Sequence, residues 1–337
     1  VALLPGVAQN VSAGAELAAT ASGTTGDIAI ALGQVDAESL SVIDGAIDLD
    51  AVRAVQQPLV DVQASLDELR STVESVHSPW LISRLQSELD ELQAEFDDNQ
   101  PRLANAIDAV RLAPQLLGGN GVRRYMVMFN SPVEARGLAG FLGNFAIVNV
   151  DNGRIEVTKF GRRSELDEGA PDGVRCDGCP TEMIDRYGVF GLDIGDGTFG
   201  KSGWTAMTMP AHFPYVGEAT QIMYPQSGGE PLDGVISMDP YVVQTLMAYT
   251  GPIQLPEAGL TVQPENAADF LLEGQYLLLD EGTNDERIEA IDQLGQEVIR
   301  ALLAGALPVP SQLARDLGPL ITEQRLLVWT DNADEQA

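Results

Sequence analysis

The sequence predicts an α/β protein in which an N-terminal helical region precedes an α/β sandwich. Apolar residues recur every three or four positions between Asp50 and Val76, which is typical of a helix. After Gly121 the apolar residues alternate with a period of two, as they do in half-buried strands. Farther along, strand-like segments alternate with helical ones, and this order favours an α/β sandwich over an all-β fold. We expect residues 1–118 to form the helical region and residues 119–337 the α/β domain.

The helical region contains a heptad-like apolar seam with charged residues between its members. Asn99-Gln100-Pro101 interrupts the later pattern, so we expect a second helix before this break and a third after it. The favoured interpretation is an antiparallel bundle within one chain. The alternative is a stalk or coiled coil through which copies of the chain form a homo-oligomer. The seam consists of Val52, Val55, Leu59, Val62, Leu66, Leu69, Val73 and Val76, and we expect Val62, Leu66, Leu69 and Val73 to be buried.

The α/β domain shows a strand pattern first and a mixed pattern later. We expect strands at 124–129, 145–150, 154–160 and 233–238, and helices at 241–249, 266–272 and 285–304. Asp151-Asn152-Gly153 predicts the turn of a β-hairpin. Asp239-Pro240 predicts the capped start of a helix. The segment 161–232 is rich in glycine, proline and aspartate and predicts loops with short elements.

The composition excludes several classes of protein. The 337 residues suffice for two domains and include 50 acidic against 19 basic residues, a formal net charge of −31. Such a surface repels phosphate backbones and anionic lipid headgroups, so we expect no nucleic-acid partner. The two histidines, His77 and His212, stand in unrelated contexts and leave little material for a zinc site.

The ends and the cysteines indicate the compartment. The first residues are uncharged until Glu16 and lack the basic start of a signal peptide. We therefore expect a membrane-anchoring helix before residue 1 of the full-length protein, and a continuation of the domain after Ala337. Cys176 and Cys179, the only cysteines, stand in a loop without the further ligands of a zinc site. An intraloop disulfide is favoured over a redox centre, and it is typical of an extracytoplasmic protein.

The candidate site follows from a concentration of cations between residues 123 and 163. Glu134 and Arg136 follow the first strand, and Arg162 and Arg163 follow the third. If these two strands are parallel neighbours, both groups reach the same sheet edge, where α/β folds bind ligands. Guanidinium forks match phosphate and carboxylate groups. The alternative, that these arginines only pair with the abundant carboxylates, stays open.

Three passages of the α/β domain resemble a known family. They are RRYMVMFNSPVEARGLAGFLGNFAIVNVDNGRIEV, LDGVISMDPYVVQTLMAYTGPIQL and NAADFLLEGQY. They resemble an actinobacterial cell-envelope family catalogued as domain of unknown function 4012, and the resemblance covers most of residues 103–330. It implies a membrane-anchored envelope protein but no particular activity.

A fainter similarity is to the LytR-CpsA-Psr (LCP) family, which transfers glycans from polyprenyl-pyrophosphate carriers to cell-wall or cell-surface acceptors. Glu134-x-Arg136 after the first strand is similar to that family's Asp-x-Arg. Lys159-Phe-Gly-Arg162-Arg163 comes at the place in the order where that family has Arg-Ser-Asp-Thr. Asp285-Glu-Arg287 resembles its late helix start.

This sequence also departs from the LCP pattern. Glu134 replaces an aspartate, and Arg163 stands where an aspartate is expected. Gln275-Tyr276-Leu277 replaces an arginine pair that would hold pyrophosphate. A shared fold with weakened or lost catalysis is therefore compatible with the similarity.

The similarity implies an LCP-like α/β sandwich and phosphoryl-transfer chemistry. Glu134, Arg136 and Arg162 would be the catalytic residues: the arginines would neutralise pyrophosphate, and Glu134 would hold Mg²⁺ or orient an arginine. An apolar groove would hold the polyprenyl tail. Further ligand-binding residues would be Arg124, Asn130, Asn144, Arg163, Asp239 and Arg287. We expect an extracytoplasmic, membrane-anchored envelope protein that binds and transfers a lipid-linked glycan. The alternative is a non-enzymatic scaffold that oligomerises through its helices.

Overall fold

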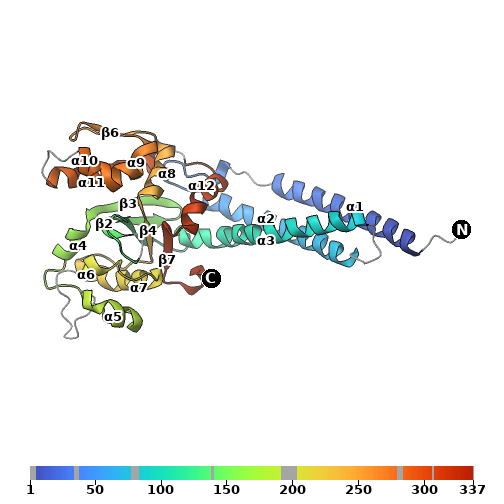
Figure 1. Cartoon of the computed structure of the whole chain (residues 1–337), viewed down its shortest axis with the longest axis horizontal. Helices are drawn as coiled ribbons and strands as arrows, with labels where there is room; N and C mark the ends of the chain where they lie inside the picture. The colour runs from blue at the N-terminus through green and yellow to red at the C-terminus, as the bar shows by residue number, and fades with distance from the viewer. Residues whose placement is uncertain are drawn as a thin grey trace. The chain divides into compact units, whose positions relative to one another are not determined.

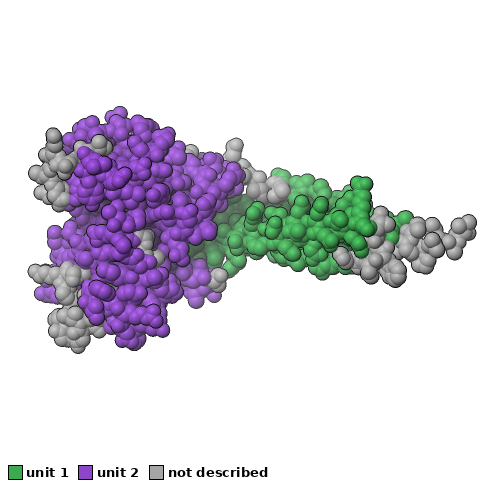
Figure 2. Space-filling model, in the orientation of Figure 1, with its two compact units in different colours: residues 1–40, 48–116 green, residues 41–47, 117–337 purple. Residues whose placement is uncertain are grey.

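The computed structural model describes residues 5–33, 38–76, 83–137, 140–190, 203–278, 284–305 and 307–336. The chain forms two compact units, which Figure 2 colours separately. The first comprises residues 1–40 and 48–116, and the second comprises residues 41–47 and 117–337. The segment 41–47 belongs to the second unit because Ala46 forms β-bridges with both Ile43 and Arg154.

The first unit consists of long helices that lie side by side (Figure 1). They are α1 (Pro5–Gly33), α2 (Leu49–Val76) and α3 (Ser83–Leu116), with a 3₁₀ turn, η1 (Glu38–Leu40), after α1. Thr24 donates to the Ser65 carbonyl near the middle of α2, whereas Ala13 clusters with Val73 near its end. α1 and α2 are therefore antiparallel. None of the helices in the described ranges is long and apolar enough to span a bilayer.

The apolar seam of α2 packs inside this unit. Val73 is fully buried and forms one apolar cluster with Ala13 of α1 and Leu89 of α3. The prediction that these helices pack on each other is confirmed. Leu66 differs from the expectation, because it is half-buried and lines a small cavity between α2 and α3. The predicted seam residues that are buried include Val62, Leu69 and Val73.

The predicted break at Asn99-Gln100-Pro101 is wrong. α3 continues through Pro101, with residues of the same helix packed along α2 on both sides of it. Arg70 of α2 pairs with Asp97 at 3.2 Å and also donates to Gln100, just before the proline. These contacts hold both sides of Pro101 in one helix, although the proline lacks an N–H and crowds the preceding turn.

A mixed five-stranded sheet forms the centre of the second unit. Its order is β3-β2-β1-β4-β7, in which β1–β2, β2–β3 and β4–β7 are antiparallel and β1–β4 is parallel. The predicted hairpin turn is confirmed, since Asn152 and Gly153 both adopt positive φ angles. The strands are β1 (Arg123–Ser131), β2 (Phe141–Asp151), β3 (Arg154–Arg162), β4 (Gly234–Met238) and β7 (Leu326–Thr330).

Helices cover both faces of this sheet (Figure 1). One face packs against α4 (Arg163–Glu168), α5 (Thr181–Tyr187), α6 (Gly203–Ala206) and α7 (Phe213–Met223). The other face packs against α8 (Pro240–Thr250), α9 (Ala267–Asp269), α11 (Asn284–Ala304) and the hairpin β5 (Ile253–Leu255)–β6 (Leu260–Val262). The remaining elements are η2 (Gly188–Phe190), η3 (Tyr224–Ser227), η4 (Pro264–Asn266), η5 (Phe270–Gly274), α10 (Gln275–Leu278), α12 (Pro310–Thr322) and α13 (Ala333–Gln336).

Candidate functional site

The candidate site lies where β1, β3 and β4 end. Ser131 of β1 pairs with Phe141 of β2, Arg162 of β3 pairs with Asn144 of β2, and β4 is parallel to β1. β1 and β3 are not neighbours, because β2 lies between them. They still run in the same direction, since each is antiparallel to β2. Both arginine groups therefore reach one edge of the sheet.

A cavity of about 340 Å³ opens at this edge. Side chains from β1, β3, β4, α8, η5 and α11 make its apolar wall, and residues at the strand ends and on α11 make its polar lining. The apolar wall includes Phe129, Phe160, Met238, Val243, Leu271 and Leu294. The predicted site residues in the lining are Asn130, Glu134, Asn144, Arg162, Arg163, Asp239 and Arg287.

Arg162 is held at the cavity by Asp292 of α11. Arg162 Nε donates to one carboxylate oxygen of Asp292, and Asn144 Nδ2 donates to the other. The Arg162 side chain is 39% exposed, so this paired guanidinium stays accessible from the cavity. The sequence did not predict a role for Asp292, because nothing near it distinguishes it from the many other acidic residues.

Arg136 and Arg163 lie against the ring of Phe141. Their guanidinium carbons are 4.8 and 5.4 Å from the ring centroid, within the range of cation–π contact. Both also bind Thr205 of α6: Arg136 donates to its carbonyl, and Arg163 donates to its Oγ1 at 3.0 Å. Arg136 is not part of the cavity lining, but it contacts Phe141, which lines the cavity together with Arg163.

Two carboxylates balance this arginine pair. Glu134 accepts a hydrogen bond from Arg136 at 3.0 Å, and Asp167 pairs with Arg163 one turn along α4. Burial raises the pKa of the Asp167 carboxyl above its ordinary value, although the adjacent Arg163 lowers it in part. Arg163 Nε is buried and has no hydrogen-bond partner among the described atoms.

Arg287 brings a further cation to the cavity from α11. Its Nη1 donates to Gln275 Oε1 at 2.9 Å, and its guanidinium lies 4.5 Å from the ring centroid of Tyr276. Gln275 and Tyr276 follow η5, a π-helical turn of a kind often found at functional sites. Gln275 and Tyr276 therefore position an arginine from another helix.

Three other predicted residues have structural partners. Arg124 lies at the start of β1, at the end of the sheet opposite the cavity. There it donates to the Pro231 carbonyl at 2.9 Å. Asn130 is buried and donates to Ser237 Oγ at 2.7 Å. Asp239 caps α8 by accepting from the N–H groups of residues 241 and 242. The assignment of Asp239 to the ligand site therefore overlaps with a structural role. The assignment of Arg124 is wrong, because Arg124 does not line the cavity.

The predicted Mg²⁺ site depends on carboxylates at the cavity, Glu134 first. No group of three or more His, Cys, Asp or Glu side chains that could hold a metal ion occurs within the described ranges. Glu134, the predicted ligand, is bound to Arg136. Mg²⁺ stays a prediction, and no step proposed below depends on it.

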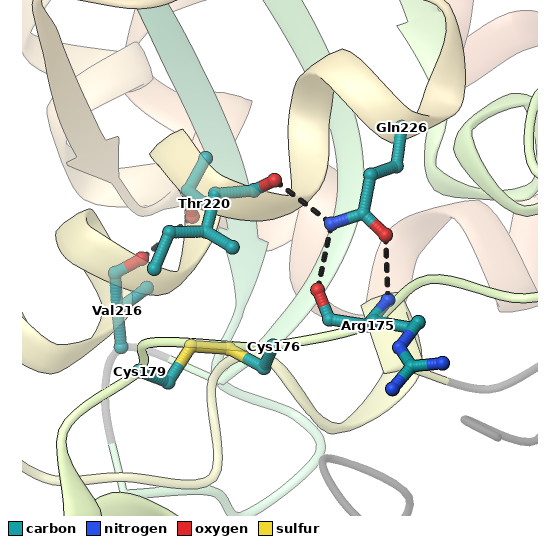
Figure 3. Close-up of a disulfide and its surroundings, with 7 residues drawn as sticks. Arg175, Cys176, Cys179, Val216, Thr220 and Gln226 are labelled. Carbon is teal, nitrogen blue, oxygen red and sulfur yellow. Dashed lines mark hydrogen bonds between the residues drawn. A yellow bond between two sulfur atoms is a disulfide. The ribbon is translucent and has the colours of Figure 1, made fainter. Parts of the chain in front are cut away.

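The cysteine pair lies on the other face of the sheet. Cys176 and Cys179 form a disulfide with a Cα–Cα distance of 5.3 Å, which confirms the predicted pairing (Figure 3). Both cysteines belong to the buried cluster beneath α4–α7. Gln226 holds the neighbouring backbone, because its side-chain amide accepts from Arg175 N at 2.8 Å and donates to Arg175 O at 2.6 Å (Figure 3).

The fold and the site define a mixed α/β domain whose sheet edge opens into an apolar cavity rimmed by arginines. The family model described as protein of unknown function (DUF4012) matches residues 120–276, and the chain thus contains a DUF4012 domain. This segment runs from before β1 into α10, whereas α11 with Arg287 and Asp292 follows it. No curated protein and no solved structure matched the chain, so the similarity to the LCP family stays a prediction.

Proposed function

We propose that the cavity binds a polyprenyl-diphosphate-linked glycan in the cell envelope. One observation carries the proposal: cationic side chains from β3, α4 and α11 line the same cavity as a continuous apolar wall. An anionic headgroup fits the cationic side chains, and a hydrocarbon chain fits the apolar wall. A cavity for a purely polar anion would leave its apolar wall in contact with water.

The charges favour a diphosphate among anionic headgroups. Arg162 and Arg163 are consecutive residues at the end of β3 and the start of α4, and Arg287 lines the same cavity from α11. Guanidinium groups bind phosphate oxygens through paired, charge-assisted hydrogen bonds. In a chain of formal charge −31, several cations around one cavity form a local site for an anion.

A transfer reaction at this site is the more specific form of the proposal. An acceptor hydroxyl would attack the phosphorus that carries the glycan, and the P–O bond to the prenyl phosphate would break. Glycosyl phosphate would then be on the acceptor, prenyl monophosphate would leave, and the hydroxyl proton would pass to solvent. Arg162 and Arg136 would stabilise the charge that develops, with Glu134 orienting Arg136. Release of prenyl monophosphate from a glycan-loaded diphosphate would reveal such transfer.

The cellular setting is part of the same proposal. The disulfide supports an oxidising, extracytoplasmic compartment. We propose that the full-length protein is membrane-anchored there, which would keep it near a lipid-linked substrate. Fractionation of cells that express the full-length protein, followed by protease treatment of intact cells, tests both points.

The binding experiment compares arginines at opposite edges of the sheet. Calorimetric titration of the chain with geranylgeranyl diphosphate should show binding, and Arg162→Ala should weaken it by at least about tenfold. Arg162→Lys should restore only part of the affinity, since lysine lacks the fork. Arg124→Ala is the matched control and should leave the affinity unchanged. If the parent binds no prenyl diphosphate, or if both alanine variants weaken binding equally, the proposal fails.

The scaffold alternative depends on the helices. The seam residue Val73 is covered by α1 and α3 of the same chain, so this seam gives no support to self-assembly. Sedimentation equilibrium of the chain tests the alternative directly. A monomer at micromolar concentration is the expected result, and a stable oligomer would favour the scaffold.

A further inference from the structure

A second groove runs between β3 and α11. It has a volume of about 540 Å³, and its walls come from an outer strand of the sheet and the C-terminal half of α11. The apolar side chains in its walls are Ile155, Val157, Phe160, Ile299 and Leu303. All of them are half-buried, so part of their apolar surface remains in contact with water.

This groove and the cavity are adjacent, because Phe160 lines both. Gly295 of α11 faces its ring, and a Cβ at Gly295 would lie 2.6 Å from Phe160 Cζ. Gly295 lines the cavity, whereas the next residue, Gln296, lines the groove. The Phe160 ring, packed against Gly295, therefore lies between the two spaces and borders both.

The cations of the groove already have acidic partners. Lys159 Nζ lies 3.5 Å from Glu165 Oε2, and Arg300 pairs with Glu297. At the cavity end, Arg162 and Arg163 are also paired, with Asp292 and Asp167, but Arg287 adds a third guanidinium to the lining. An elongated amphipathic ligand would thus place its anionic end in the cavity and its apolar end in the groove.

The length of the path sets the length of the ligand. Seven residue steps separate Arg162 from Ile155, and at about 3.3 Å per residue the strand spans about 23 Å. A geranyl chain has two isoprene units and ends near the cavity. Chains of four or more units extend along β3 into the groove.

We propose that the β3–α11 groove receives the distal part of the prenyl chain whose diphosphate is held beside Arg162, so that the protein selects long prenyl chains over short ones. The inference rests on the proposed function, because it needs a prenyl diphosphate in the cavity. The apolar walls explain the selection: every isoprene unit that leaves water for the groove adds favourable free energy.

The test is a calorimetric series with geranyl, farnesyl and geranylgeranyl diphosphate, each below its critical micelle concentration. The parent should bind more tightly with each added unit. Ile299→Asp makes the groove polar, and Gln296→Trp fills it from an exposed position of α11. Both variants should keep the parent's affinity for geranyl diphosphate and weaken geranylgeranyl diphosphate binding by at least about tenfold. Ile321→Asp, an exposed isoleucine on α12, is the matched control and should change neither.

The outcomes separate the inference from the proposed function. Equal affinity of the parent for all three lipids would overturn the groove inference and leave the diphosphate site standing. Absence of binding to every lipid would overturn the proposed function itself. If Ile299→Asp lowers the melting temperature, Gln296→Trp decides, and an unchanged chain-length dependence in that variant would overturn the inference.

Discussion

Asp292 of α11 holds Arg162 at the end of β3, across 130 residues of sequence. Arg162 lines the cavity, and the pair places a carboxylate beside the guanidinium that we propose to bind phosphate. Asp292 therefore has two opposing effects. It positions Arg162, and it competes with an anionic ligand for the same charge.

We expect Asp292→Asn to tighten binding of geranylgeranyl diphosphate several-fold, because it removes a negative charge next to the anion. The carboxamide preserves the size of the side chain. Asp50→Asn, at an exposed acid on α2, is the charge-matched control and should have little effect. Calorimetry measures all three affinities. Weaker binding to Asp292→Asn would show that Asp292 acts mainly by positioning Arg162, and an unchanged affinity would place the anion away from both residues.

Gly217 of α7 packs under Trp329 of β7, and a Cβ there would lie 2.2 Å from the buried indole. Gly217→Ala should therefore destabilise the protein by about 1–3 kcal/mol, despite the better helix propensity of alanine. Gly318→Ala on α12 has nothing within 4 Å and should stabilise it by about 0.5–1 kcal/mol. Urea unfolding followed by circular dichroism gives both values, and equal shifts in the two variants would contradict the close contact.

Val73 and Val60 lie on the same helix in different surroundings. Val73 is 0% exposed, and Val60 is 39% exposed. Val73→Ala should lower the free energy of unfolding by about 2 kcal/mol, because it leaves a cavity between α1, α2 and α3. Val60→Ala should change it by less than about 0.5 kcal/mol. Similar losses in chemical denaturation would show that the seam is not packed as described.

The disulfide closes a short loop, so its effect on stability should be moderate. Replacing both Cys176 and Cys179 by serine should cost about 2 kcal/mol, the loop-closure entropy of a bridge between residues three apart. Dithiothreitol should lower the melting temperature of the parent and leave that of the double variant unchanged. An unchanged parent would indicate that the bridge does not contribute to stability.

Tyr249 donates a hydrogen bond to Asp316, and its pKa is raised to about 12, first by burial and then by this carboxylate. The unfolded phenol ionises near pH 10, so its contribution is fully present below about pH 10 and is lost as pH rises to about 12. Tyr249→Phe lacks the hydroxyl. We expect the parent's stability advantage over this variant to shrink across that interval in urea titrations at stepped pH. A constant advantage would contradict the raised pKa.

Much of the secondary structure was predictable because its signals are local. The period of α2, the alternation in β1 and the Asn152-Gly153 turn depend on residues that are near in sequence. The prediction failed at Pro101, where the local signal favoured a break. Contacts with α2, such as Arg70 with Asp97, outweigh that signal and keep α3 continuous.

The candidate site was predictable only in part. Arg162 and Arg163 follow a strand end, and strand ends at a sheet edge are a general location for ligands. Arg124 has the same residue type and a similar local context, yet it starts its strand and lies at the opposite edge. Asp292 had no local signal at all, and Gln275 was noted only as a departure from the LCP pattern.

The sequence by itself determined several helices and strands, such as α2, β1 and β3, and which arginines follow strands, since side-chain periodicity and turn chemistry act over a few residues. Only the tertiary structure decided which segments are neighbours: β2 between β1 and β3, α11 against β3, and Gln275 against Arg287. The physical reason is that these contacts join positions far apart in the chain. Their free energy comes from burying complementary apolar and charged surfaces, and no single segment contains both halves of such a contact.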